Sequence, residues 1–316
     1  MIQPNPAAFS PSFWGGAGCL PFAGQIALQL TQMCRLFGFR SVIPSQVHSS
    51  LVAAENALGT QSNQHPDGWG VAFYIDGSPH VTRSPQTALG DQLFHRLSGV
   101  VASETVLAHV RRATQGANTV LNCHPFQYGR WVFAHNGDIP DFTRYRDRIE
   151  DEIAPRLRRF ILGDTDSERL FYIFLTRLEG YGPLNRRHSL EDVVNSMRQT
   201  VKLVKDLWQG SSDGKPLLLT MMATDGDSLV GHQGGKELYL STYKKSCPER
   251  ERCSSLSAEC EAPSNTGFVN HFILSSEPLQ GHNVWLALEE GEIAGVDGRM
   301  KTLRAAPNHV VLPVAS

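Results

Sequence analysis

The chain has 316 residues with 29 basic and 31 acidic side chains, a formal net charge of −2. This near-neutral balance gives no electrostatic reason to expect binding to nucleic acid or to an anionic membrane. The length allows one large domain or two, with a substantial core. No run after the first 33 residues is long and apolar enough to span a membrane, so we expect a soluble, cytoplasmic protein.

Residues 1–33 form a segment without any Lys, Arg, Asp or Glu, and the first formal charge is Arg35. A secretory signal needs a basic region before its apolar stretch, and this segment has none. A spanning helix is excluded by several glycines and by four prolines, Pro4, Pro6, Pro11 and Pro21. We therefore expect a non-catalytic extension, which is either a misassigned start, a cleaved propeptide or a retained segment.

The first half of the remaining chain reads mainly as strands that end in polar motifs. Strands are predicted over 34–40, 71–75, 105–110 and 131–135, and a helix over about 46–58. His65 to Gly70 forms a turn, 122–126 a loop, and the last strand is expected to stop at Asn136-Gly137.

The second half reads as helices followed by strands. Helices are predicted over 142–160, with a possible break at Pro155, over 167–178 and over 190–208. Strands are predicted over 217–223, 228–231, 238–241, 268–275, 285–288 and 293–296. Strands, then helices, then strands again indicate an α+β fold of two antiparallel sheets with helices packed outside them.

A Ser-, Glu- and Arg-rich segment at 246–267 is predicted to be a surface insertion. It contains Cys247, Cys253 and Cys260, whose spacings do not match the paired cysteines of structural zinc sites. Six cysteines in a chain of this length, without a signal, are more typical of cytosolic thiols than of a disulfide framework. No metal or cofactor is therefore expected.

Cys34 directly follows Met33, and this pair predicts unusual chemistry. If translation starts at Met33 and that methionine is trimmed, Cys34 becomes the N-terminal residue. Its thiol is then a nucleophile and its own α-amine, with a pKa of about 7.7–8.0, is a built-in base. A retained extension would convert the amine to an amide and remove this base.

Six motifs then follow one another in a fixed order. They are Met-Cys-Arg at 33–35, Asp-Gly-Trp-Gly at 67–70, His-x-Arg-x-Ala-Thr-x-Gly at 109–116, Asn-x-His-Pro-Phe at 122–126, His-Asn-Gly at 135–137 and Thr-Asp-Ser-Glu at 165–168. Together they resemble the class II glutamine amidotransferases, N-terminal-nucleophile hydrolases with a four-layer αββα fold. The resemblance implies that residues 34–316 form one glutamine amidotransferase domain.

The resemblance also implies roles for individual residues. Cys34 is similar to the nucleophile that forms a γ-glutamyl thioester, and Asn136 and Gly137 to the oxyanion hole. Arg111 is similar to the residue that grips the substrate α-carboxylate, and Asp166 to the one that binds its α-ammonium. Four further residues match positions in or beside this pocket: Thr114, His124, Asp67 and Gly68.

Elementary chemistry agrees with these roles, because a free amino acid presents a carboxylate and an ammonium on one carbon. An Arg fork and a carboxylate at a fixed separation recognise that pair. Each residue also has a plainer interpretation. Cys34 could be a buried structural thiol and Arg111 an ion-pair residue. Asn136-Gly137 could be a hairpin turn and Asp166 only a helix cap. His109 and His124 are as readily packing residues as catalytic ones.

The motifs 122–126 and 275–279 most resemble the stand-alone branch of the family, which includes ergothioneine-pathway and glutathione-degrading γ-glutamyl hydrolases. We therefore expect hydrolysis of the γ-glutamyl amide bond of glutamine or a small conjugate, with release of glutamate. Two alternatives stay open. The chain could be a glutaminase subunit that supplies ammonia to a separate synthase partner, or a non-catalytic regulator that binds γ-glutamyl ligands. The partners expected are a small γ-glutamyl substrate and a separate synthase or hydrolase subunit.

Overall fold

The computed structural model describes residues 34–46, 51–52, 57–62, 65–247 and 260–307. All of them belong to one compact unit, Met33–Ser316. None of the helices in these ranges is long and apolar enough to cross a membrane. The prediction that 246–267 is an insertion falls largely outside the described residues.

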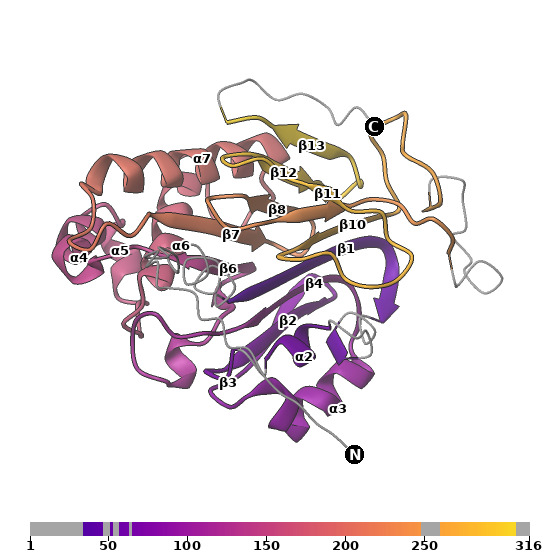
Figure 1. Cartoon of the computed structure of the whole chain (residues 1–316). Coiled ribbons are helices and arrows are strands. Elements are labelled where there is room, and N and C mark those ends of the chain that lie inside the picture. The colour runs from indigo at the N-terminus through magenta and orange to yellow at the C-terminus, as the bar shows by residue number, and fades with distance from the viewer. Residues whose placement is uncertain (1–33, 47–50, 53–56, 63–64, 248–259, 308–316) are drawn as a thin grey trace, which may run out of the picture. The chain divides into compact units, whose positions relative to one another are not determined.

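Two antiparallel sheets form the centre of this unit (Figure 1). The first has the strand order β11-β9-β10-β1-β4-β2-β3. Its strands are β1 (Arg35–Gln46), β2 (Trp69–Ile75), β3 (Ser78–Ser84), β4 (Ala102–Val110), β9 (Tyr239–Ser241), β10 (His271–Ser275) and β11 (Leu286–Ala287). The second has the order β13-β12-β8-β7-β6-β5. Its strands are β5 (Phe126–Tyr128), β6 (Trp131–Asp138), β7 (Leu218–Thr224), β8 (Leu229–His232), β12 (Ile293–Val296) and β13 (Thr302–Ala305).

Helices cover the outer face of each sheet. The first sheet is covered by α2 (Leu58–Gln61) and α3 (Gln92–Val100), and the second by α4 (Phe142–Asp151), α6 (Asp166–Glu179) and α7 (Leu190–Leu207). The short α5 (Pro155–Arg158) lies between α4 and α6 in the chain. An apolar cluster with Leu36, Leu107 and Met222 fills the space between the sheets. The expected four-layer αββα sandwich is thereby confirmed.

Strand β6 shows how the sequence assigns side chains to layers, since successive residues point to opposite faces. Val132 and Ala134 pack between the sheets, whereas Trp131 and Phe133 pack against the helices. The strand continues through Asn136, which pairs with Thr220 of β7. The predicted strand end at Asn136-Gly137 and the alternative of a hairpin turn there are both wrong, because β7 pairs with β6 as far as Asp138.

Other element predictions were largely accurate in type and less so in extent. The break before Pro155 is confirmed, since α4 ends at Asp151 and α5 begins at Pro155. Strands β3, β5 and β13 and helix α3 were not predicted. The helix expected over 46–58 is corrected at both ends: Gln46 still belongs to β1, and α2 begins only at Leu58. Much of the stretch between them lies outside the described residues.

The loop before α6 is fixed by side chains of the helix itself. The Thr165 hydroxyl accepts a hydrogen bond from the Glu168 N–H at 3.3 Å and caps the helix. The Glu168 carboxylate in turn accepts from the N–H groups of Leu162 (3.0 Å) and Gly163 (2.7 Å). Arg169 donates to the Gly163 carbonyl at 2.6 Å. These contacts fix the position of the first residue of α6, Asp166.

Candidate active site

A small cavity lies where β1, β4, β6 and the start of α6 meet. Its lining consists of Cys34, Arg111, Arg112, Thr114, Gln115, His124, His135, Gly137, Thr165, Asp166 and Ser167. Six of the nine residues predicted for the site line this cavity, although they come from five motifs spread over more than 130 positions. Asn136, Asp67 and Gly68 lie in its surroundings.

Cys34 lies directly before β1 and is buried. Its Sγ accepts a hydrogen bond from the Arg112 N–H and donates to the Arg112 carbonyl, both at 3.2 Å. Burial raises the pKa of the Cys34 thiol to about 11, although Arg112 and the nearby Arg111 act against this. At neutral pH the thiol is therefore protonated, and a base would have to remove its proton before it could act as a nucleophile.

Arg111 follows the last residue of β4 and is 2% exposed. Its Nη2 donates to the Gln115 carbonyl at 2.7 Å, while Nη1 is buried and has no partner within the described residues. A buried guanidinium N–H without an acceptor is costly unless a ligand supplies one. The alternative of an ion-pair residue finds no support, because the described part of the chain offers Arg111 no carboxylate partner.

Asp67 and Gly68 fix the backbone of Arg111 through hydrogen bonds. The Arg111 N–H donates to the Gly68 carbonyl at 2.7 Å, and the Asp67 N–H donates to the Arg111 carbonyl at 3.1 Å. The Asp67 carboxylate also accepts from the Ala113 N–H at 2.9 Å. Gly68 has φ of +125°, and a Cβ there would lie 2.7 Å from the Cys123 sulfur. This turn therefore positions the end of β4, beside the cavity and outside its lining.

Asp166 is the first residue of α6 and is 2% exposed. Its carboxylate accepts from the Ile139 N–H at 2.8 Å and from the Ser167 N–H at 2.7 Å. Burial raises the pKa of this carboxyl group, and His135 opposes the rise. The cap of α6 is Thr165, so the alternative that Asp166 serves only as the helix cap is wrong.

Asn136 and Gly137 lie on opposite faces of β6. Gly137 lines the cavity, and a Cβ there would collide with the Leu218 carbonyl and the His135 ring. Asn136 points between the sheets, where its Nδ2 donates to the Ser276 hydroxyl at 3.4 Å. That hydroxyl also accepts from the Leu36 N–H at 2.9 Å, which places the Asn136 amide close to the start of β1. Asn136 Oδ1 is buried and has no partner in the described ranges.

His124 lines the cavity, and its ring centroid lies 4.2 Å from that of His109. Both rings are buried, and neither ring nitrogen of His124 has a hydrogen-bond partner among the described residues. Burial lowers the pKa of both imidazoles well below the usual value, so both are neutral at pH 7. Thr114 lines the same cavity.

Five lining residues were not predicted: Arg112, Gln115, His135, Thr165 and Ser167. Two of them had a usable signal. His135 immediately precedes Asn-Gly on a predicted strand, whose side chains alternate between its two faces. Ser167 follows Asp166 at the predicted start of a helix. Period-2 and first-turn geometry could have placed both beside Asp166.

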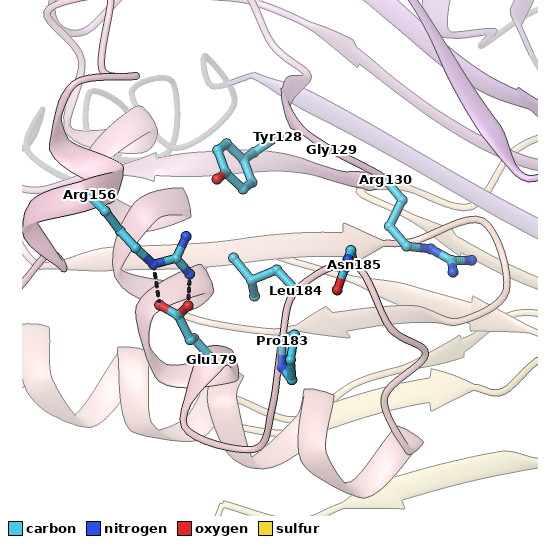
Figure 2. A pocket seen from close by; sticks show the side chains of 8 residues that line it. All are labelled: Tyr128, Gly129, Arg130, Arg156, Glu179, Pro183, Leu184 and Asn185. Carbon is cyan, nitrogen blue, oxygen red and sulfur yellow. Dashed lines mark hydrogen bonds and ion pairs between the residues drawn. The ribbon is translucent and has the colours of Figure 1, made fainter.

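A larger hollow of about 530 Å³ lies elsewhere and contains none of the predicted residues. Figure 2 shows Arg156 and Glu179 facing each other there, joined by two contacts. Arg130, also in its lining, is paired with Asp225 and Asp227. Because these charges are already compensated, the hollow gives no indication of a charged ligand.

The cysteine-rich segment provides no metal site within the described ranges, where no group of His, Cys, Asp and Glu could hold an ion. Cys247 and Cys260 are free thiols, and Cys253 falls outside these ranges.

Comparison with known proteins decides the family. Residues 33–311 match the class-II glutamine amidotransferases, and the match begins directly before Cys34. The chain belongs to this family. The family and enzyme class expected from the motifs are thereby confirmed.

Three curated relatives of this class II amidotransferase have informative names. A probable glutamine amidotransferase, DUG3 of Saccharomyces cerevisiae, is 29% identical over 63% of this chain and 62% of its own length. The putative glutamine amidotransferase YafJ of Escherichia coli is 30% identical over 46% and 55%. The γ-glutamyl-hercynylcysteine sulfoxide hydrolase of Mycobacterium tuberculosis is 42% identical over 23% and 32%. Each alignment thus spans less than two thirds of the relative.

Solved structures agree on the fold. A class-II glutamine aminotransferase domain protein from Silicibacter pomeroyi superimposes with a TM-score of 0.57 at 19% identity, over 86% of this chain and 98% of that one. The glutamine phosphoribosylpyrophosphate amidotransferase of Bacillus subtilis gives a TM-score of 0.55 at 13% identity, over 88% and 50%. At these identities the likeness concerns the fold alone.

Proposed function

We propose that this class II amidotransferase hydrolyses the γ-glutamyl amide bond of glutamine or of a small γ-glutamyl conjugate. One observation carries the proposal: a single cavity brings together a buried thiol, a buried guanidinium with an unpaired N–H, and a buried carboxylate. A γ-glutamyl group offers the matching partners, which are an electrophilic carbonyl, a carboxylate and an ammonium.

Substrate binding follows from the charges of the cavity. The α-carboxylate pairs with Nη1 of Arg111, and the α-ammonium pairs with Asp166. Each charge-assisted hydrogen bond contributes about 1.5–3 kcal/mol. Thr114 and His124 complete the polar wall, and Asp67 and Gly68 keep Arg111 in place.

Catalysis begins when Cys34 Sγ attacks the γ-carbonyl carbon. The carbonyl oxygen becomes an oxyanion, which accepts from the Gly137 N–H and the Asn136 Nδ2–H. A donor of this kind contributes about 2.7–4 kcal/mol of transition-state stabilisation. The tetrahedral intermediate expels ammonia or an amine and leaves a thioester on Cys34. Water then attacks the thioester carbon and releases glutamate and the free thiol.

The raised pKa of the Cys34 thiol makes a base necessary. Neutral His124 is a weak base because its own pKa is well below the usual range. The α-amine of a chain that begins at Cys34 is a better base, because its pKa lies near 8. We therefore propose that the active form begins at Cys34 and that residues 1–33 take no part in the chemistry.

The name of one relative, a γ-glutamyl-hercynylcysteine sulfoxide hydrolase, supports hydrolysis. The alternative of an ammonia-supplying subunit draws on the glutamine–fructose-6-phosphate aminotransferase of Rhizobium leguminosarum, of which this chain covers only 28%. In that case a separate subunit would use the ammonia. A cytoplasmic location and the absence of nucleic-acid partners stay predictions.

The test is glutamate release by protein that begins at Cys34, with Cys34→Ala as the control and glutamine, glutathione and other γ-glutamyl amides as substrates. Cys34-dependent turnover supports the proposal, and a conjugate turned over well above glutamine identifies the substrate class. Feeble turnover of glutamine alone favours a missing partner. No turnover of any substrate by a chain that begins at Cys34 overturns the proposal and favours the non-catalytic binding protein.

A further inference from the structure

A single buried serine connects the two sheets beside Cys34. Ser276 directly follows β10 and is 6% exposed. Its hydroxyl oxygen accepts from the Leu36 N–H of β1 at 2.9 Å and from Asn136 Nδ2 of β6 at 3.4 Å. Strand β1 belongs to the first sheet and β6 to the second. One hydroxyl therefore links the strand that follows the nucleophile to the strand that carries the proposed oxyanion donors.

The backbone of Ser276 is fixed without help from its hydroxyl. Its N–H donates to the Leu36 carbonyl at 3.0 Å, and the preceding residue, Ser275, pairs with Phe37 in the first sheet. Removing the hydroxyl should therefore leave the Ser276 backbone beside β1. Only the two groups that donate to its oxygen would lose a partner.

The hydroxyl oxygen of Ser276 matches these donors in number. It has two lone pairs, so it can accept from the Leu36 N–H and from the Asn136 amide at the same time. Asn136 Nδ2 carries two hydrogens, and the bond to Ser276 uses one of them. The other can serve a ligand atom. The bond of 3.4 Å is long, and catalytic hydrogen bonds are often longer without substrate than in the transition-state complex.

Ser276 is also the group that decides where the Asn136 amide points. Among the described residues this contact is the only hydrogen bond of the Asn136 side chain, because Oδ1 has no partner there. The neighbouring Gly137 N–H needs no such support, since the backbone of β6 pairs with β7 as far as Asp138. A side-chain amide can rotate about its single bonds, whereas a strand N–H cannot.

We propose that Ser276 is a positioning residue for the oxyanion formed during hydrolysis. This inference rests on the proposed function, in which Asn136 Nδ2 and the Gly137 N–H bind that oxyanion. By holding the Asn136 amide against the strand that follows Cys34, Ser276 sets the separation between this donor and the nucleophile. A donor held in place stabilises the transition state well, because it does not have to reorient as the charge forms.

The test measures kcat and KM for glutamate release by chains that begin at Cys34 and carry Ser276→Ala or Ser276→Thr. Ser276→Ala should lower kcat about tenfold or more with little change in KM, because the hydroxyl acts on the transition state and not on the groups at Arg111 and Asp166 that bind the substrate. Ser276→Thr, which keeps the hydroxyl, should restore most of the rate.

Ser103→Ala is the matched control for the loss of a buried serine hydroxyl. The Ser103 hydroxyl accepts from the N–H groups of Tyr74 and Thr105, both at 3.2 Å, and Ser103 does not line the cavity. Like Ser276→Ala, this change should lower stability in urea unfolding, because it leaves buried N–H groups without that acceptor. Unlike Ser276→Ala, it should leave kcat unchanged.

A double-mutant cycle shows whether Ser276 acts through Asn136. Asn136→Ala removes the donor itself and should lower kcat about a hundred- to a thousandfold. In that background Ser276→Ala should cost no more than about twofold, because no amide is left to position. An unchanged kcat in Ser276→Ala, a loss expressed mainly as a higher KM, or an equal loss with and without Asn136 would overturn the inference.

The inference and the proposed function fail in different ways. Cys34-dependent turnover that Ser276→Ala does not slow would overturn the inference alone. A chain that begins at Cys34 and turns over no γ-glutamyl substrate would overturn the proposed function and the inference with it. Thermal unfolding checks that each variant folds. If Ser276→Ala does not fold, Ser276→Cys takes its place and should lower kcat in the same way, because its sulfur is a weak acceptor.

Discussion

At the scale of single residues, the cavity and its surroundings are marked by buried polar atoms that lack a hydrogen-bond partner in the described ranges. Arg111 Nη1, both nitrogens of His124 and Asn136 Oδ1 are buried without a hydrogen-bond acceptor or donor in the described ranges. Most buried polar groups in proteins are satisfied, so such a concentration around one thiol indicates a site prepared for a polar ligand.

Replacing Arg111 with Lys tests the proposal that its guanidinium holds the α-carboxylate of the substrate. Lysine keeps the charge but has no planar fork, so it cannot contact both Gln115 and a ligand in the same geometry. We expect the KM for γ-glutamyl substrates to rise about ten- to a hundredfold. Glutaminamide, in which the α-carboxylate is an amide, is the matched substrate. A similar rise for glutaminamide would show that the change is not specific to the carboxylate.

The Cys34 thiol should react slowly with alkylating agents at neutral pH. A pKa of about 11 leaves about one thiolate in ten thousand at pH 7, compared with a few per cent for an ordinary cysteine. Because only the thiolate reacts, the rate should rise about tenfold per pH unit up to about pH 10. Iodoacetamide labelling followed by peptide mass spectrometry measures this in the full chain, where Cys34 is amide-linked. A plateau below pH 8 would contradict the buried, unassisted thiol.

At the scale of elements, the start of α6 determines where Asp166 lies. The Thr165 cap, the Glu168 carboxylate and Arg169 all bind the preceding loop. The site thus depends on one helix end being held firmly, whereas the rest of α6 packs in the apolar layer.

Thr165→Ala should therefore affect both stability and ligand binding. Loss of the cap should lower the free energy of unfolding by about 0.5–2 kcal/mol. Affinity for L-glutamate should fall as well, because Asp166 directly follows the cap. Ser189→Ala is the matched control, since Ser189 caps α7 through a capping box and does not line the cavity. It should cost similar stability in urea unfolding without changing affinity; an equal loss of affinity would contradict a local role for Thr165.

The sequence predicted elements well where the pattern is local. Apolar alternation and cap residues located β6, α6 and α7 to within a few residues. Asn136-Gly137 was misjudged because the same dipeptide suits a turn, and only pairing with distant β7 keeps it in a strand. Arg111, Asp166 and Cys34 could be chosen from ordered motifs. The Ser167–His135 contact could not, because it depends on how closely α6 approaches β6.

At the scale of the whole molecule, buried neutral histidines are spread through both sheets and the loops. Burial lowers the pKa of His65 and His232 to about 4 and that of His271 to about 3. Burial also lowers the pKa of His109 and His124 well below the usual value. In the unfolded chain each titrates near 6.5.

Stability should consequently fall on mild acidification. Below pH 6.5 these histidines bind protons in the unfolded chain but stay neutral in the folded chain. The free energy of unfolding therefore decreases as the pH falls from 6.5 towards about 4. Each histidine contributes up to about 1.4 kcal/mol per pH unit in that window. The raised pKa values of Asp166, Glu168 and Asp225 act in the opposite direction at the acidic end. Urea unfolding at pH 7, 6 and 5 measures the slope, and a flat profile would contradict it.

The alternation of β6 has a further consequence for how this chain can vary in length. Asn136 faces one layer, while His135 and Gly137 face the other. Deleting or inserting one residue between Trp131 and Asn136 would exchange the two faces and remove both sets of contacts at once. Two such changes in succession would restore the faces but shift the pairing with β7. Strand β6, with eight residues, should therefore accept substitutions far more readily than any change in its length.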